Sequence, residues 1–102
     1  MLDHERIRRE GMRWNILLTL GHARPSGCWE ELVLDTVQAI HPDTTRLELH
    51  RELDHVADLG LIEIEKKPYG RWYAKLNARG TNVVDYTADC PPGIARPTKK
   101  YW

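Results

Sequence analysis

Hydrophobic positions in the first part of the chain recur every three or four residues, which is typical of an amphipathic helix. Asp3 is a suitable N-terminal cap, and Gly21 follows the last periodic residue as a stop signal. We therefore predict a first helix over residues 3–20, with Arg6, Arg9 and Arg13 on its polar face. Its opposite face collects Ile7, Gly11, Trp14, Leu17 and Leu18.

The same periodicity predicts a second helix from about Cys28 to Ile40, after a loop that contains proline and glycine. Pro42 ends this helix, because the residue before a proline is disfavoured in the helical region. Acidic residues near its start suit the positive end of the helix dipole, and we expect Glu30, Glu31 and Asp35 to face outward. Its apolar stripe consists of Trp29, Leu32, Val33, Val37 and Ile40.

A third helix is predicted to begin at Thr44 or Thr45 and to end at Gly60, which suits a left-handed C-terminal cap. Thr45 and Glu48 have the spacing of a capping box, in which two side chains satisfy backbone donors reciprocally. The buried stripe of this helix consists of Leu49, Leu53, Val56 and Leu59.

The period then changes to two, because residues 61–65 alternate apolar and charged side chains as in a half-buried strand. Residues 66–70 supply a turn and residues 71–76 a return strand, and Asn77 caps a short final helix that reaches about Tyr86. We predict an α+β fold, mainly α, with three helices, a two-stranded hairpin, a short C-terminal helix and an extended tail. The expected domain spans residues 1–87, and a proline-rich tail spans residues 88–102.

Two segments resemble the winged helix-turn-helix family. Leu49 to Ile62 has spaced leucines that lead into Gly-Leu-Ile, where the family's recognition helix ends and its first wing strand begins. Gly70 to Gly80 resembles the second wing strand and the Leu-Thr-x-x-Gly that follows it, with Asn77 in place of the threonine. This resemblance covers residues 10–86. The whole chain, including Pro-Gly-Ile-Ala-Arg-Pro around Gly93, also resembles small proteins of Mu-like transposable phages, a resemblance that implies no particular activity.

The winged-helix resemblance implies a double-stranded DNA partner and a transcriptional regulator of phage or bacterial type. The start of the third helix would enter the major groove, where Arg46 or Arg51 could pair with guanine. The wing tip would follow the neighbouring phosphate backbone. The implied contact residues are Thr44, Thr45, Arg46, Glu48, His50 and Arg51 in the helix and Lys66, Lys67, Tyr69 and Arg71 in the wing.

Each of these residues also has an ordinary structural interpretation. The threonines suit helix capping, the arginines suit surface ion pairs, and the lysines protect a hairpin edge. The third helix carries more acidic than basic residues, which opposes its approach to phosphates, and Leu47 lies off its buried stripe. Two alternatives therefore stay open: a winged-helix module of a phage that binds protein and not DNA, and a structural component of a phage assembly.

Composition limits the kinds of function and the cellular location that we expect for this chain. The formal net charge of the 102 residues is zero, so a DNA-binding surface would depend on local clustering of its cations. No apolar run is long enough for a membrane span, and we expect a cytoplasmic protein with free thiols at Cys28 and Cys90. We expect no cofactor, metal or enzymatic activity, because no such residue spacing occurs. A homodimer could form through the first helix and the C-terminal tail, where Tyr101 and Trp102 are costly to leave in water.

Overall fold

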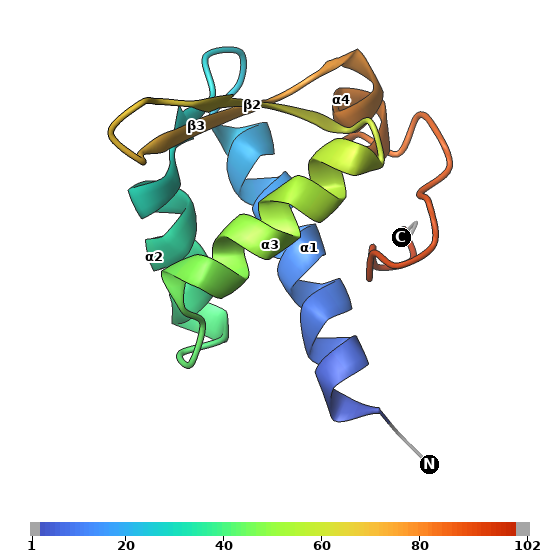
Figure 1. Cartoon of the computed structure of the whole chain (residues 1–102). Helices are drawn as coiled ribbons and strands as arrows, with labels where there is room; N and C mark the ends of the chain where they lie inside the picture. The colour runs from blue at the N-terminus through green and yellow to red at the C-terminus, as the bar shows by residue number, and fades with distance from the viewer. Residues whose placement is uncertain (1–2, 100–102) are drawn as a thin grey trace.

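The computed structural model describes residues 3–99, which form four helices and a three-stranded antiparallel sheet of order β1-β3-β2 (Figure 1). The chain is α+β and mainly helical. In sequence order the elements are α1 (His4–His22), β1 (Cys28–Trp29), α2 (Glu30–Ile40), α3 (Arg46–Asp58), β2 (Ile62–Lys66), β3 (Trp72–Leu76) and α4 (Ala78–Val84). Within residues 3–99, no helix is long and apolar enough to cross a membrane.

Helix α1 is the centre of the fold, and α2, α3, α4 and β3 all pack against it. Its capping prediction is confirmed, since the Asp3 carboxylate accepts a hydrogen bond of 3.1 Å from the Arg6 amide. The predicted single apolar face is wrong in two ways. Ile7, which was expected on this face, is exposed, and other elements cover more than one side of the helix. Its buried apolar side chains are Met12, Trp14, Ile16, Leu17 and Leu20.

A third strand was not expected from the sequence. The second helix was predicted from Cys28, but Cys28 and Trp29 form β1 and pair with Ala74 and Tyr73 of β3. A strand of two residues is too short to show an alternating pattern, so only its distant partner defines it. The two-stranded hairpin is therefore the larger part of a three-stranded sheet.

Helix α2 also differs from its predicted orientation. Val33 and Val37 are buried as expected, whereas Leu32 and Ile40 face solvent. Glu30, which was predicted to face outward, is instead buried at the start of the helix. The apolar stripe is therefore divided, with one part in the core and another on the surface.

Helix α3 begins one residue after its cap, and the Thr45 hydroxyl accepts from the Glu48 amide at 3.1 Å. The reciprocal half of the predicted capping box is wrong, because the Glu48 carboxylate binds Arg8 of α1, with Nη2 2.8 Å from Oε1. At the other end Gly60 has a φ of +79°, which favours glycine and confirms the expected cap.

The β2–β3 hairpin has the predicted position, with Ile64 opposite Ala74 and Lys66 opposite Trp72. Asn77 caps α4 as expected, since its side chain accepts from the Gly80 amide at 2.8 Å. Helix α4 is shorter than predicted and ends at Val84.

The described part of the tail packs on its own domain. Ile94 is buried, and the Ala95 amide donates to the Glu10 carbonyl of α1 at 3.1 Å. Arg13, predicted on the polar face of the first helix, donates to the Gly93 carbonyl at 2.8 Å and to the buried Glu52 carboxylate at 2.5 Å. The predicted dimer contacts of Tyr101 and Trp102 lie outside the described residues.

Candidate nucleic-acid interface

The first turn of α3 and the hairpin turn (residues 67–71) adjoin each other. Arg46 joins them directly, because its Nη2 donates to the carbonyl of Gly70 at 2.8 Å. Most of the side chains predicted to contact DNA therefore lie on one continuous surface. We call it the α3–hairpin surface, and it consists of Arg46, Leu47, His50, Arg51, Lys66, Lys67, Tyr69 and Arg71.

Glu30 lies beneath this surface and holds its parts together. The carboxylate is only 3% exposed and accepts hydrogen bonds from Arg46, from His50 at 3.0 Å and from the Trp72 amide at 2.7 Å. Burial acts to raise the pKa of Glu30, but the hydrogen bonds from His50, Trp72 and Arg46 outweigh it, so the pKa is lowered. One carboxylate of α2 thus fixes two side chains of α3 and the start of β3.

The aromatic ring of Trp72 is a second link between α3 and the sheet. The His50 ring stacks on it with centroids 3.8 Å apart and planes inclined by 3°. The Lys66 ammonium lies 4.3 Å from the centre of the Trp72 ring. His50 is therefore held by both a carboxylate and an indole, and its ring nitrogen Nε2 is already engaged.

Most cations of the α3–hairpin surface already have a carboxylate partner. Lys66 lies 3.1 Å from Asp54, Lys67 lies 2.6 Å from Glu65, and Arg71 lies 2.5 Å from Glu31. Arg71 also covers the Trp29 ring at 3.9 Å, and Arg46 is paired with Glu30. Among residues 3–99, Arg51 is the one cation of this surface with no ion pair.

Three of the predicted contact residues serve the fold instead. Thr44 is buried, and its hydroxyl donates to the His41 carbonyl at 2.8 Å, so this side chain is not on the surface. Thr45 caps α3. Glu48 is turned toward α1, where the hydrogen bond from Arg8 lowers its pKa. The carboxylate that most opposed an approach to phosphate is therefore neutralised by an arginine of another helix.

The residues left free on this surface are Leu47, Arg51 and Tyr69. Leu47 is 62% exposed and lies four residues before Arg51, so the two occupy the same side of α3. The supporting roles of Glu30 and Trp72 were not predicted from the sequence. Acidic residues at a helix start have a sufficient local explanation, and only the fold brings Glu30 next to Arg46 and His50.

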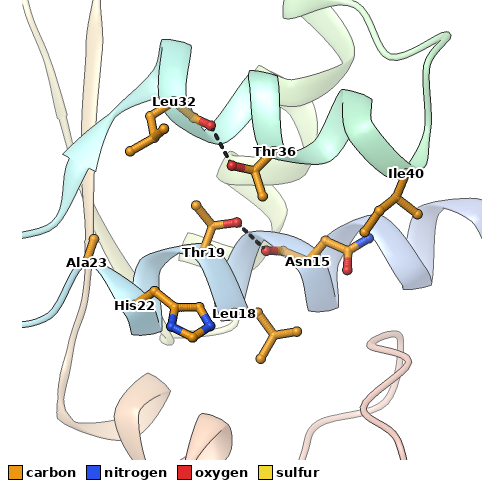
Figure 2. Close-up of a pocket in the computed structure, with 8 residues that line it drawn as sticks. All are labelled: Asn15, Leu18, Thr19, His22, Ala23, Leu32, Thr36 and Ile40. Carbon is orange, nitrogen blue, oxygen red and sulfur yellow. Dashed lines mark hydrogen bonds between the residues drawn. The ribbon is translucent and has the colours of Figure 1, made fainter.

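A separate feature lies between α1 and α2. It is on a different side of α2 from Glu30, the residue that binds Arg46. Figure 2 shows this open groove, which has a volume of about 390 Å³. From α2 it is lined by Leu32, Thr36 and Ile40, and from α1 and the residue after it by Asn15, Leu18, Thr19, His22 and Ala23. We call this feature the α1–α2 groove.

The part of the chain that the structure describes contains no group of three or more His, Cys, Asp or Glu side chains that could hold a metal ion. Comparison with protein-family models, with curated proteins and with solved structures finds no match for this chain.

Proposed function

We propose that this chain is a winged-helix module that binds double-stranded DNA through the α3–hairpin surface and acts as a transcriptional regulator of phage or bacterial type. The observation that carries the proposal is the contact of Arg46 with Gly70, which joins the first turn of α3 to the hairpin turn. A helix start and a basic hairpin held side by side are the two parts with which winged helices reach the major groove and the neighbouring backbone.

The paired cations remain usable by DNA, because most of their partners are exposed. Glu31 and Glu65 lie at the surface, where an ion pair contributes about 1 kcal/mol or less. A phosphate can replace such a carboxylate at little cost. Arg46 differs, since its partner Glu30 is buried, and we assign it to support and not to recognition.

The difference between paired and unpaired cations assigns a role in DNA binding to each residue of the α3–hairpin surface. Arg51 is free and faces solvent from α3, so it reads a guanine edge, with Leu47 one turn earlier against a thymine methyl group. Lys66, Lys67 and Arg71 contact phosphates. We expect moderate affinity, because these cations must exchange carboxylate partners for phosphates.

The salt dependence of duplex binding tests the proposal. Three phosphate contacts from cations predict that the affinity falls roughly 40-fold between about 50 and 200 mM salt. Fluorescence anisotropy with a labelled duplex library measures this, and Arg71→Ala should reduce the slope of log affinity against log salt by about one. Absence of binding at the lower salt concentration would contradict the proposal.

Two neighbouring glutamates on β2 offer a matched pair of variants. Glu65 pairs with Lys67 beside the hairpin turn, whereas Glu63 pairs with Lys75, 3.6 Å away, farther along the hairpin. Glu65→Gln frees a cation of the α3–hairpin surface and should strengthen DNA binding by about threefold, since the lost competitor is a weak surface pair. Glu63→Gln removes the same charge away from the surface and should leave the affinity nearly unchanged. Equal effects would show that only overall charge matters.

A second function is favoured by a specific observation: large apolar side chains are exposed both on the α3–hairpin surface and beside the α1–α2 groove. Leu47 and Tyr69 stand out on the α3–hairpin surface, and Leu32 and Ile40 beside the α1–α2 groove. A protein-binding module would use these side chains and would need no excess of cations. It predicts no duplex binding at any salt concentration and a stable complex that Leu47→Ala weakens.

A further inference from the structure

Strand β2 is an edge of the three-stranded sheet, so one of its sides has no partner strand among residues 3–99. Hydrogen-bonded pairs alternate along an antiparallel ladder, and the bonds at its two ends fix the pattern. At one end the Asn77 amide donates to the Leu61 carbonyl at 3.2 Å. At the other end the Lys67 amide donates to the Arg71 carbonyl at 2.9 Å. Odd-numbered residues of β2 therefore turn their backbone groups toward β3, and even-numbered residues turn theirs outward.

The accessible part of this outward edge is centred on Ile64 and Lys66. Ile62, the third outward residue, is buried, whereas Ile64 is half-buried and Lys66 is exposed. In the part of the chain that the structure describes, no other element forms a hydrogen bond with the backbone N–H or C=O of either residue. The Lys66 side chain is drawn away to the Trp72 ring and to Asp54. The edge therefore lacks the cover that usually prevents strand addition.

The outer face of β2 beside this edge suits a cation. Glu63 and Glu65 lie on it, with side chains that are 62% and 65% exposed. An open hollow of about 280 Å³ runs along the strand and is lined by Ser26, Glu63, Ile64, Glu65, Tyr73 and Lys75. Glu65 is bound by Lys67 at 2.6 Å, but Lys75 stays 3.6 Å from Glu63, too far for a hydrogen bond. The hollow thus holds two carboxylates against one ammonium, and Glu63 keeps its acceptor capacity.

A second copy of β2 does not match this edge. Outward residues pair with outward residues, so the odd-numbered ones also face each other across an antiparallel pair. Pairing Ile64 with Lys66 of the second copy places Glu65 opposite Glu65 of the second copy. Pairing Ile64 with itself places Glu63 opposite Glu65 of the second copy. Like charges directly opposite each other destabilise a strand pair, so the fitting strand carries cations at these positions.

We infer that the outward edge of β2 binds an extended basic segment of another protein, which adds a further strand antiparallel to β2. The residue opposite Ile64 exchanges both backbone hydrogen bonds with it and is apolar or β-branched. Its two neighbours point to the outer face, where lysine or arginine meets Glu63 and Glu65 beside the Tyr73 ring. Main-chain bonds supply the affinity, and the carboxylates select a basic-apolar-basic sequence.

A synthetic peptide and the isotope-labelled full-length chain test this inference. The test contains no DNA, so its result is independent of the proposed function. The probe is Thr-Val-Lys-Val-Lys-Val-Thr with an acetylated start and an amidated end, which presents both lysines on one face. We expect a dissociation constant on the order of 100 µM. Nuclear magnetic resonance should show the largest signal changes at the amides of Ile64 and Lys66, and slower hydrogen exchange at Ile64.

Methylation of the peptide backbone tests strand addition without altering the protein. The amide of the central valine donates to the Ile64 carbonyl, whereas the amides of the lysines point away from β2. N-methylation of the central valine should lower the affinity at least about tenfold, since it removes one hydrogen bond and blocks close approach. N-methylation of one lysine is the matched control and should change the affinity about twofold or less.

Charge variants test the choice of partner. Glu63→Lys should weaken binding about fivefold, because an attractive cross-strand pair becomes a repulsive one. Asp35→Lys makes the same change at an exposed position of α2 and should leave the affinity nearly unchanged. A peptide with glutamates in place of its lysines should bind the Glu63→Lys chain better than the wild type.

Several results would overturn the inference. These are an unchanged Ile64 signal at millimolar peptide, equal effects of the two methylated peptides, and equal affinity of the wild type for the lysine and glutamate peptides. Edge signals that move with protein concentration alone would show that a second copy occupies the edge and would overturn it as well.

Discussion

Glu30 and Glu31 are adjacent in the sequence and carry the same chemical group, yet they lie in opposite environments. Glu30 is buried with three donors around it, whereas the side chain of Glu31 is 57% exposed and contacts Arg71. A buried carboxylate whose partners include a backbone amide cannot be removed without leaving those donors unsatisfied. At the scale of a residue, burial and not charge decides what each glutamate contributes.

Alanine at these two positions should therefore have unequal effects on stability. Glu30→Ala leaves Arg46, His50 and the Trp72 amide without their acceptor, and we expect it to lower the free energy of unfolding by about 3 kcal/mol. Glu31→Ala should cost about 1 kcal/mol or less. Urea denaturation followed by tryptophan fluorescence measures both values. Similar losses for the two variants would contradict the role assigned to Glu30.

The elements differ in how far their sequence determines them. The Asp3, Thr45 and Asn77 caps and the β2–β3 hairpin were predictable, because their signals lie within a few residues of one another. Strand β1 was not, since its pairing partner Ala74 is distant in the sequence. The same limit applies to the candidate site: its residues could be listed, but Glu30 and Glu31, which pair with Arg46 and Arg71, come from a different element, α2.

Two glycines in contrasting packing environments test the contacts between elements. A Cβ at Gly80 of α4 would overlap the backbone carbonyl of Leu61, so Gly80→Ala should cost about 3 kcal/mol by forcing α4 away from the sheet. A Cβ at Gly11 of α1 would meet His41 at an ordinary distance of 3.7 Å. Gly11→Ala should therefore raise stability by about 0.5–1 kcal/mol through better helix propensity. Thermal unfolding gives both signs, and a loss at Gly11 would contradict this packing.

The formal net charge of the whole molecule is zero, but its charged side chains form ion pairs between particular elements. Arg8 binds Glu48 and Arg13 binds Glu52, so two arginines of α1 hold two glutamates of α3. These pairs join the central helix to the helix of the candidate interface. Their effect is to position α3 and to pair its acidic groups with cations.

Stability should consequently fall in acid. The pKa of Glu48 is lowered by Arg8, and that of Glu30 is lowered on balance by its donors. A carboxylate with a lowered pKa in the folded state stabilises the fold above its ordinary value of 4.5, and this contribution is lost as the pH falls below it. Urea midpoints should be constant near neutral pH and decline below about pH 4.5. Glu48→Gln should flatten part of that decline, and an unchanged profile would contradict the pairing.

The contact between the tail and α1 also has a consequence for how the protein is made. Arg13 and the Gly93 carbonyl that it binds are 80 residues apart, and Ala95 hydrogen-bonds to Glu10. The ribosome releases α1 early, but Ile94 covers its part of the core only after it too has emerged. A nascent chain complete through α4 therefore still exposes apolar surface to chaperones and proteases. Closure of the domain therefore waits for the segment made after α4 and is not complete once the four helices have formed.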